Sequence, residues 1–141
     1  MRMKKVDSII VGLGLAGVAY ATQMLGADKS FVVLADDSQT ASVVAGGLYN
    51  PTILKRFTAA WKAQTQLDQA LPFYAYLERL LGGTYDYQSP ILRRFASVAE
   101  QNLWFQAADK PSLAPFLSTT LVENSNENLS IPHKFGKVRG T

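Results

Sequence analysis

The stretch that decides the fold reads VDSIIVGLGLAGVAYATQMLGADKSFVVLA and covers residues 6–35. Its first part, Val6–Val11, is rich in β-branched residues and ends at a glycine, which predicts a buried strand. The residues of Leu15–Leu25 suit a helix, and a glycine follows at the place where the helix should end. Phe31–Ala35 predicts a second buried strand. Strand, helix and strand within about 30 residues form one crossover unit, so we expect two parallel strands with a right-handed connection.

The turn between the first strand and the helix carries a G-x-G-x-x-G pattern, Gly12-Leu13-Gly14-Leu15-Ala16-Gly17. After a strand and before a helix, this pattern predicts a dinucleotide-binding turn. The first glycine permits the tight turn, the second lets a pyrophosphate approach the backbone, and the third lets the helix lie close to the strand. The free N–H groups at the helix start would receive the phosphate charge. A glycine-rich turn without a ligand is the alternative interpretation.

The same fingerprint expects an acidic residue at the end of the second strand, where it binds ribose hydroxyls. Ala35 fills the expected position, and Asp36 and Asp37 follow it directly. We therefore take Asp36, with Asp37 beside it, as the candidate ribose-binding acid. The alternative is that these carboxylates cap a turn or a helix.

The next segment, residues 40–51, reads TASVVAGGLYNP, is rich in small residues and shows no periodicity, which predicts a loop. In it, Ser42 is followed by Ala45-Gly46-Gly47-Leu48. This spacing resembles the second flavin-contacting loop of the D-amino-acid oxidase-like family of FAD-dependent oxidoreductases, which includes glycine oxidase and sarcosine oxidase. GGLYNP after an ADD strand end is also similar to the FAD domain of the bifunctional tRNA wobble-uridine modifying enzymes.

The resemblance implies that FAD is the cofactor. Gly12, Gly14 and Gly17 would meet the pyrophosphate and Asp36 the adenosine ribose, while Ser42 and the backbone of Ala45–Leu48 would meet the pyrophosphate and the isoalloxazine side. It also implies oxidation of the C–N bond of a small-molecule amine or amino acid by hydride transfer to the flavin. The substrate-binding residues of this family lie largely in its later half, so no catalytic residue is assigned.

The rest of the chain predicts a helical block followed by an antiparallel part. The expected elements are a helix over residues 58–81 that is kinked or divided at Pro72 and ended by Gly82-Gly83, strands at 85–87 and 91–98, a helix at 99–108, a loop with a short helix at 111–117, and strands at 119–122 and 129–138. The fold class is therefore α/β: a Rossmann-like FAD/NAD(P)-binding βαβ unit with a helical segment and the start of an α+β substrate subdomain. The expected divisions are 1–57, 58–83 and 84–141.

Composition excludes several kinds of site. The chain has 141 residues, no cysteine and one histidine, so thiol catalysis, thiolate metal sites and disulfides are excluded, and no metal site is expected. The net charge of +3 is spread over scattered Lys and Arg residues, which indicates no nucleic-acid surface.

Other candidate side chains favour structural roles. Arg93 and Arg94 could face a substrate carboxylate, but adjacent strand residues point to opposite faces, and surface charge is preferred. Tyr49 could approach a flavin, although packing is the simpler role. Trp61, on the expected helix face, and Trp104 are expected in a core or interface. His133 lies in a polar segment with nothing nearby to make it a base or a ligand.

Two other functions stay open. The fold could bind NAD(P) instead of FAD. Alternatively, MRMKK followed by the apolar stretch Ile9–Ala21, which ends in Ala19-Tyr20-Ala21, has the outline of a signal peptide on an exported, non-enzymatic domain. The polar pair Asp7-Ser8 weighs against that reading, and 13 apolar residues are too few to span a membrane. We expect a cytoplasmic protein. Because the family resembled is more than twice as long, the resemblance implies an N-terminal part of a longer enzyme.

Overall fold

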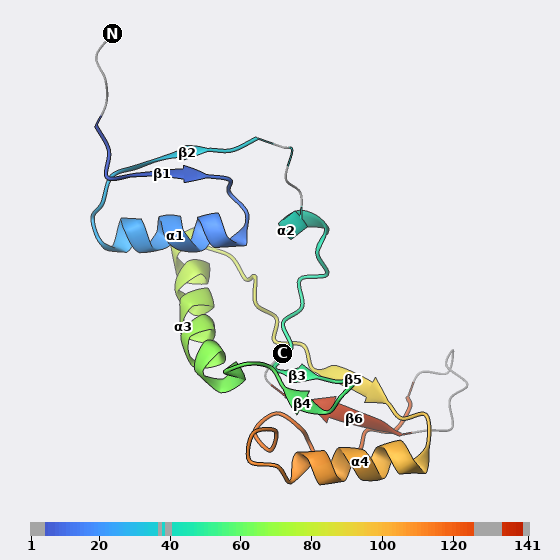
Figure 1. Ribbon diagram of the computed structural model, residues 1–141. Helices are drawn as coiled ribbons and strands as arrows, with labels where there is room; N and C mark the ends of the chain where they lie inside the picture. Colours follow the sequence, from blue (N-terminus) through green and yellow to red (C-terminus); the bar gives the residue numbers. More distant parts are fainter. Residues whose placement is uncertain (1–4, 37, 39–40, 126–133, 140–141) are drawn as a thin grey trace. The chain divides into compact units, whose positions relative to one another are not determined.

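The structure is a computed structural model that describes residues 5–36, 38, 41–125 and 134–139. The chain forms two compact units, Met1–Leu48 and Tyr49–Thr141. The boundary follows Leu48, whereas the sequence-based division has its first boundary after residue 57. The described residues combine helices with small two-stranded sheets, which is compatible with the α/β class (Figure 1). None of the helices in this part of the chain has the length and apolarity needed to cross a bilayer.

The first unit is a βαβ crossover, as the sequence predicts. It consists of β1 (Ser8–Val11), α1 (Leu15–Gly26) and β2 (Phe31–Leu34). β1 and β2 pair in parallel, from Ser8 opposite Phe31 to Val11 opposite Leu34. The stretch with the outline of a signal peptide forms most of β1 and the first two turns of α1.

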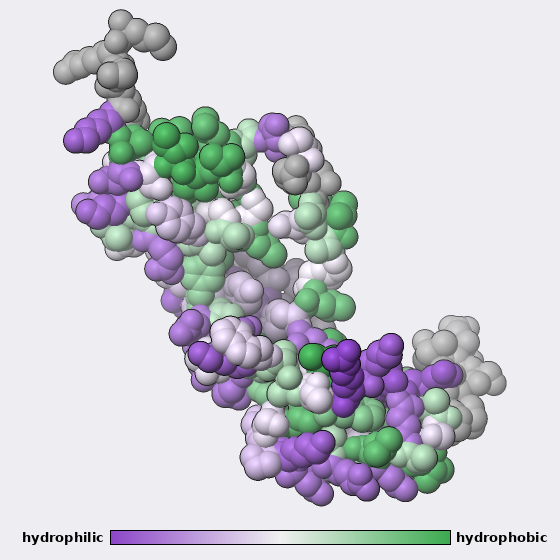
Figure 2. Space-filling view, viewed as in Figure 1, coloured by the Kyte–Doolittle hydropathy of each residue, from purple (hydrophilic) through white to green (hydrophobic). Residues whose placement is uncertain are grey.

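One face of this sheet is bare, and the prediction of two buried strands is therefore wrong: of the eight strand residues only Ile10 is buried, and four are exposed. Ile10 is 6% exposed, but its neighbours Ile9 and Val11 are 61% and 81% exposed. On β2, Val32 and Leu34 are also exposed. The alternation arises because α1 covers a single face of the two strands. We call Ile9, Val11, Val32 and Leu34 the apolar sheet face; a hydrophobic patch lies over these strands in Figure 2.

On either side of the boundary at Leu48, the structure differs from the prediction in two places. Within the expected loop, α2 (Ala41–Val44) forms one helical turn. The helix expected from residue 58 begins only at Ala63, because β4 (Thr58–Ala59) pairs antiparallel with β3 (Thr52–Ile53). Trp61 therefore precedes the helix and is 75% exposed, which corrects its expected place in a core or interface.

α3 (Ala63–Leu81) runs through Pro72 as one continuous helix, so of the two expected outcomes, a kink or a division, the division does not occur. Proline removes the hydrogen bond to the carbonyl of Asp68, four residues earlier. Both residues are exposed, so water can satisfy that carbonyl. The helix ends as predicted: Gly82 has φ +70° and donates its N–H to Glu78 O.

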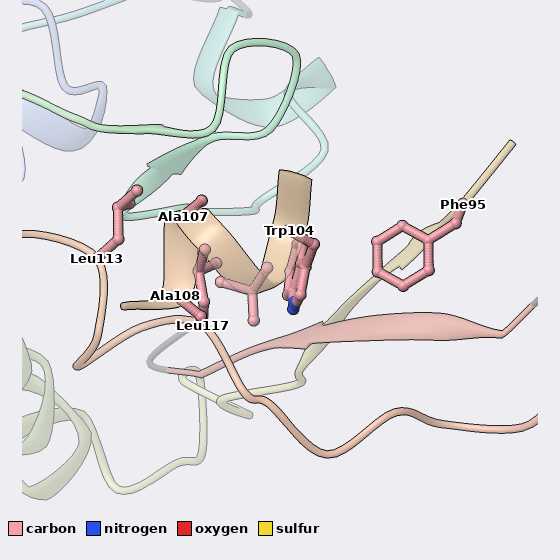
Figure 3. Packing of buried hydrophobic residues seen from close by; sticks show 7 residues of the cluster. Phe95, Trp104, Ala107, Ala108, Leu113 and Leu117 are labelled. Carbon is pink, nitrogen blue, oxygen red and sulfur yellow. The ribbon is translucent and has the colours of Figure 1, made fainter. Parts of the chain in front are cut away.

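The core of the second unit lies between a helix and a sheet. α4 (Val98–Ala108) packs its buried side against β5 (Ile91–Arg94) and β6 (Phe135–Val138), which pair antiparallel. Trp104 is fully buried, meets Phe95 edge-on at 5.5 Å between ring centroids, and donates its indole N–H to Ser118 O (Figure 3). Trp104 therefore lies in the core, one of its two expected places.

The strand predictions of this unit are partly wrong. Residues 85–87 form no strand, and β5 ends at Arg94 rather than continuing to Val98. Of the strand expected at 119–122, a single bridge from Val122 to Phe135 is formed. Residues 129–133, which include His133, lie outside the described residues.

Candidate functional site

The predicted phosphate turn lies where the two parallel strands end. Gly12 follows β1 directly and donates its N–H to Leu34 O, the last residue of β2, at 2.8 Å. Its φ is +85°, in the left-handed region that glycine tolerates and other residues avoid. The chain therefore reverses sharply at Gly12 and starts α1 from the carboxyl edge of the sheet, where nucleotide-binding folds place their ligands.

Gly17 makes the close contact that the motif predicts. A Cβ built on this residue would lie 2.2 Å from Gly12 O and 3.7 Å from Ile10 Cγ2. Only glycine fits at this distance, so the first turn of α1 packs directly against the backbone of the glycine turn at Gly12.

The start of α1 offers unpaired donors. Gly14 is its N-cap and supplies no side chain, and the first turn contains no acidic residue. Among the described residues, nothing accepts from the N–H groups of Ala16 and Gly17. These groups and the helix dipole attract an anion. The chain therefore fits a phosphate group at this point.

Ser42 joins the second motif to the first. Leu15 N–H donates to Ser42 Oγ at 3.2 Å, although the two residues are 27 positions apart. A Cβ on Gly14 would have only the Ser42 side chain within 4 Å, with Oγ at 3.0 Å. The loop that the sequence links to flavin contact is thus brought to the helix start that the sequence links to pyrophosphate.

The backbone of the rest of the second motif is not covered by side chains. Gly46 and Gly47 have nothing within 4 Å of a built Cβ, and Gly47 has φ +65°. Leu48 is 74% exposed. Ala45 closes the single turn of α2 by donating its N–H to Ala41 O. A ligand could approach this backbone closely because side chains do not cover it.

Asp36 lies two residues beyond β2, on the same edge as the glycine turn. Its Oδ1 accepts hydrogen bonds from the hydroxyl and the N–H of Ser38. These bonds, the hydroxyl first, hold the pKa of Asp36 below its usual value, so the carboxylate is charged at neutral pH. The turn-capping role that the sequence leaves as an alternative is therefore present. Asp37 lies outside the described residues.

In the second unit, Tyr49 and Asp86 form a polar pair that the sequence does not reveal. The Tyr49 hydroxyl donates to Asp86, with 2.9 Å and 3.1 Å to the two carboxylate oxygens. Burial, together with this bond, raises the pKa of Tyr49 to about 12. Tyr49 also contacts Tyr74, with 6.0 Å between ring centroids. The pair joins residues 37 positions apart, so no local sequence signal could have found it.

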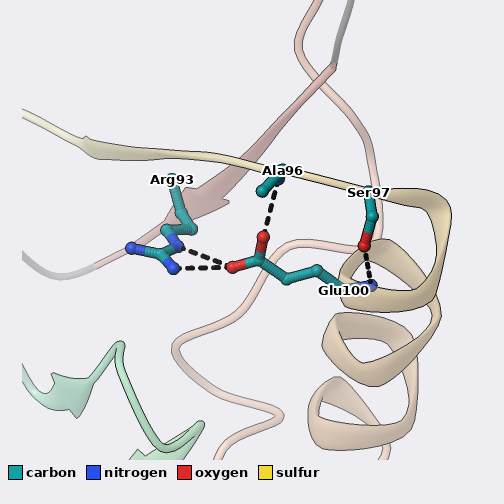
Figure 4. A network of polar contacts seen from close by, with 4 residues as sticks. All are labelled: Arg93, Ala96, Ser97 and Glu100. Atoms are coloured by element: carbon teal, nitrogen blue, oxygen red, sulfur yellow. Dashed lines mark hydrogen bonds and ion pairs between the residues drawn. The ribbon is translucent and has the colours of Figure 1, made fainter.

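Arg93 has a structural partner. Its guanidinium donates to Glu100 Oε1, with the shorter distance 2.6 Å, while Ala96 N–H donates to Oε2 (Figure 4). Glu100 N–H in turn donates to Ser97 Oγ, which caps α4. Ala96 N–H first, and Arg93 second, keep the pKa of Glu100 below its usual value. Arg93 therefore stabilises the start of α4 through a partly buried ion pair, rather than being the plain surface charge that the sequence favours.

Metal ligands do not gather within the described residues: no group of three His, Asp or Glu side chains could hold an ion there. No protein-family model matches the chain, and no solved structure matches it.

Proposed function

We propose that this chain binds FAD through a Rossmann-like unit and belongs to an oxidoreductase that oxidises the C–N bond of an amine or amino acid. The observation that carries the proposal is the hydrogen bond from Leu15 N–H to Ser42 Oγ. It unites two motifs that the sequence associates separately with dinucleotide binding. The lack of a side chain at Gly14, beside Ser42 Oγ, and the open backbone of Gly46 and Gly47 support the same conclusion.

In this proposal the residues of the first unit hold the pyrophosphate. The N–H groups of Ala16 and Gly17 donate to phosphate oxygens, and the helix dipole adds favourable charge. Ser42 Oγ already accepts one hydrogen bond, so its own hydroxyl proton remains to be donated. A serine hydroxyl at this place therefore suits an acceptor-rich phosphate.

Asp36 is proposed to bind the adenosine ribose. Both hydrogen bonds from Ser38 end on Oδ1, which leaves Oδ2 as an acceptor for a ribose hydroxyl. The carboxylate is held charged, as this role requires. Turn capping and ribose binding are then compatible, because they use different oxygens of one side chain.

FAD is preferred to NAD(P) because of the second loop. A nicotinamide site needs the glycine turn but has no requirement for Ser42 and the Ala45–Leu48 backbone, which the resemblance connects with flavin. When bound, FAD would supply the electron-accepting group for amine oxidation. The chain's own part is to hold the phosphates and ribose and to leave backbone bare for the ring system.

The test is to titrate the purified chain with FAD and to measure binding by the quenching of flavin fluorescence. NADH is added as a competing ligand. We expect FAD to bind and Gly14→Val to weaken binding at least tenfold, since the new side chain would project where the phosphate lies. Gly26→Val is the matched control: it places the same side chain on the same helix, where a built Cβ meets nothing within 4 Å.

Equal FAD affinity of the Gly14 and Gly26 variants would contradict the assignment of the phosphate site. Tighter binding of NADH than of FAD would favour the nicotinamide alternative.

A further inference from the structure

The second unit contains a hollow that no part of the cofactor site uses. Its volume is about 170 Å³. One wall is a single face of α3, formed by Ala63, Leu67, Ala70 and Tyr74, which recur at steps of four, three and four. The opposite wall is the segment that starts at Tyr49. The hollow exists because alanines occupy two positions on the helix face where larger side chains would fill the space.

The size of the hollow suits one six-membered ring. A protein cavity of about 150 Å³ lined by apolar side chains stays dry and accepts benzene. The hollow here is of similar volume, and the lining residue Gln66 is solvent-exposed, so a ligand can enter without unfolding the unit. A three-ring flavin is too large to be enclosed by it.

The lining favours an aromatic and uncharged ligand. It contains no Asp, Glu, Lys or Arg. Two of its side chains, Tyr49 and Tyr74, are aromatic, with ring centroids 6.0 Å apart and planes inclined by 37°. Aromatic rings favour further rings at such distances and tilts, so a bound ring would extend an existing cluster.

Hydrogen-bonding groups are also present in the lining. Asn50 Oδ1 accepts from Thr52, and Gln66 Nε2 donates to Trp61 O. Within the described residues, this leaves Asn50 Nδ2 as a donor and Gln66 Oε1 as an acceptor without a protein partner. A neutral hydroxyl or amino group on the ring could pair with either.

We propose that this hollow binds a single aromatic ring carrying a neutral hydrogen-bonding substituent, as in phenols and anilines. The ring lies against the face of α3 formed by Ala63, Leu67 and Ala70 and beside the rings of Tyr49 and Tyr74. Every lining residue belongs to the second unit, so the inference does not depend on FAD binding in the first.

The test uses phenol as the probe and cyclohexanol as a control of similar size that lacks the aromatic ring. Phenol is titrated into the full chain with labelled methyl groups and followed by NMR. We expect a dissociation constant of about 1 mM or tighter, at least fivefold weaker binding of cyclohexanol, and NOEs from the phenol ring to the methyl groups of Ala63, Leu67 and Ala70.

A matched pair of variants tests the position. Ala70→Leu fills the hollow and is expected to weaken phenol binding at least tenfold, whereas Gln69→Leu adds the same side chain on the exposed side of α3 and should not. Gly14→Val should bind phenol normally, which separates this test from that of the cofactor. If Ala70→Leu does not fold, the NOEs decide alone. Absent NOEs, equal binding of cyclohexanol, or full binding by folded Ala70→Leu would each overturn the proposal.

Discussion

Gly17→Ala is expected to destabilise the first unit even though alanine is the better helix former. The built Cβ lies 2.2 Å from Gly12 O, whereas close carbon–oxygen contacts are about 3.3–3.6 Å, so α1 must move by roughly 1 Å. Inserting a methyl group into a well-packed site costs about 1–3 kcal/mol, and this overlap involves backbone, which places it near 3 kcal/mol. The higher helix propensity of alanine offsets about 1 kcal/mol of this cost, so the first unit should lose about 2 kcal/mol of stability.

The control lies on the same helix. Gly26→Ala meets nothing within 4 Å and should be neutral or stabilising by about 0.5–1 kcal/mol. Both tryptophans, Trp61 and Trp104, belong to the second unit, so their fluorescence is not the suitable probe. Native-state hydrogen exchange of the β1 amides and of Gly12 N–H, which bonds Leu34 O, reports on the first unit. Equal exchange free energies in the two variants would refute the close contact at Gly17.

Two further predictions concern titrating groups of the second unit. Glu100→Gln should lower the free energy of unfolding at pH 7 by about 1–2 kcal/mol, since it weakens the bonds from Ala96 and Arg93. Because the pKa of Glu100 is lower in the folded state, its contribution to stability is present above the unfolded-state pKa and is lost as pH falls through the folded-state pKa. In urea unfolding, the variant should therefore lose less stability at acid pH than the unaltered chain does. For Tyr49 the folded-state pKa is raised to about 12, above its unfolded value of about 10. Its contribution to stability is therefore complete below about pH 10 and is lost as pH rises toward 12. Tyr49→Phe has no hydroxyl to titrate and should show a smaller loss of stability at alkaline pH, and an unchanged alkaline profile would contradict the raised pKa of Tyr49.

The βαβ unit could be predicted because its signals are local. Two apolar runs and the three glycines of the motif lie within 30 residues, and the roles of Gly12 and Gly17 follow from backbone geometry alone. The parallel register and the positive φ of Gly12 agree with that prediction.

The errors arose where tertiary context decides. Phe57 takes a left-handed φ of 48° in the β3–β4 turn without a glycine to signal it, and the helix predicted from residue 58 therefore includes β4 by mistake. Pro72 lies on the exposed side of α3, where its missing hydrogen bond is tolerated. Sequence alone does not give the orientation of either residue.

The candidate site likewise has one part that local sequence signals predict and another part that depends on tertiary contacts. The meeting of Ser42 with the start of α1 agrees with the resemblance, which assigned both motifs to the pyrophosphate. The pair of Tyr49 with Asp86 and the alanine-lined face of α3 depend on contacts between distant segments. The Tyr49–Asp86 pair carries no local sequence signal, and the helical spacing of the α3 face does not show which segment lies opposite it.

The apolar sheet face has a consequence for how this chain behaves at high concentration. Its four branched aliphatic side chains belong to two short strands, and the outer edges of these strands are unpaired in the described sheet. Strands of this composition with open edges recruit other chains, and the rate of that encounter rises with concentration, whereas folding within one chain does not. Yield on refolding from urea should therefore fall as the protein is concentrated, and a charged residue at Val11 should restore it.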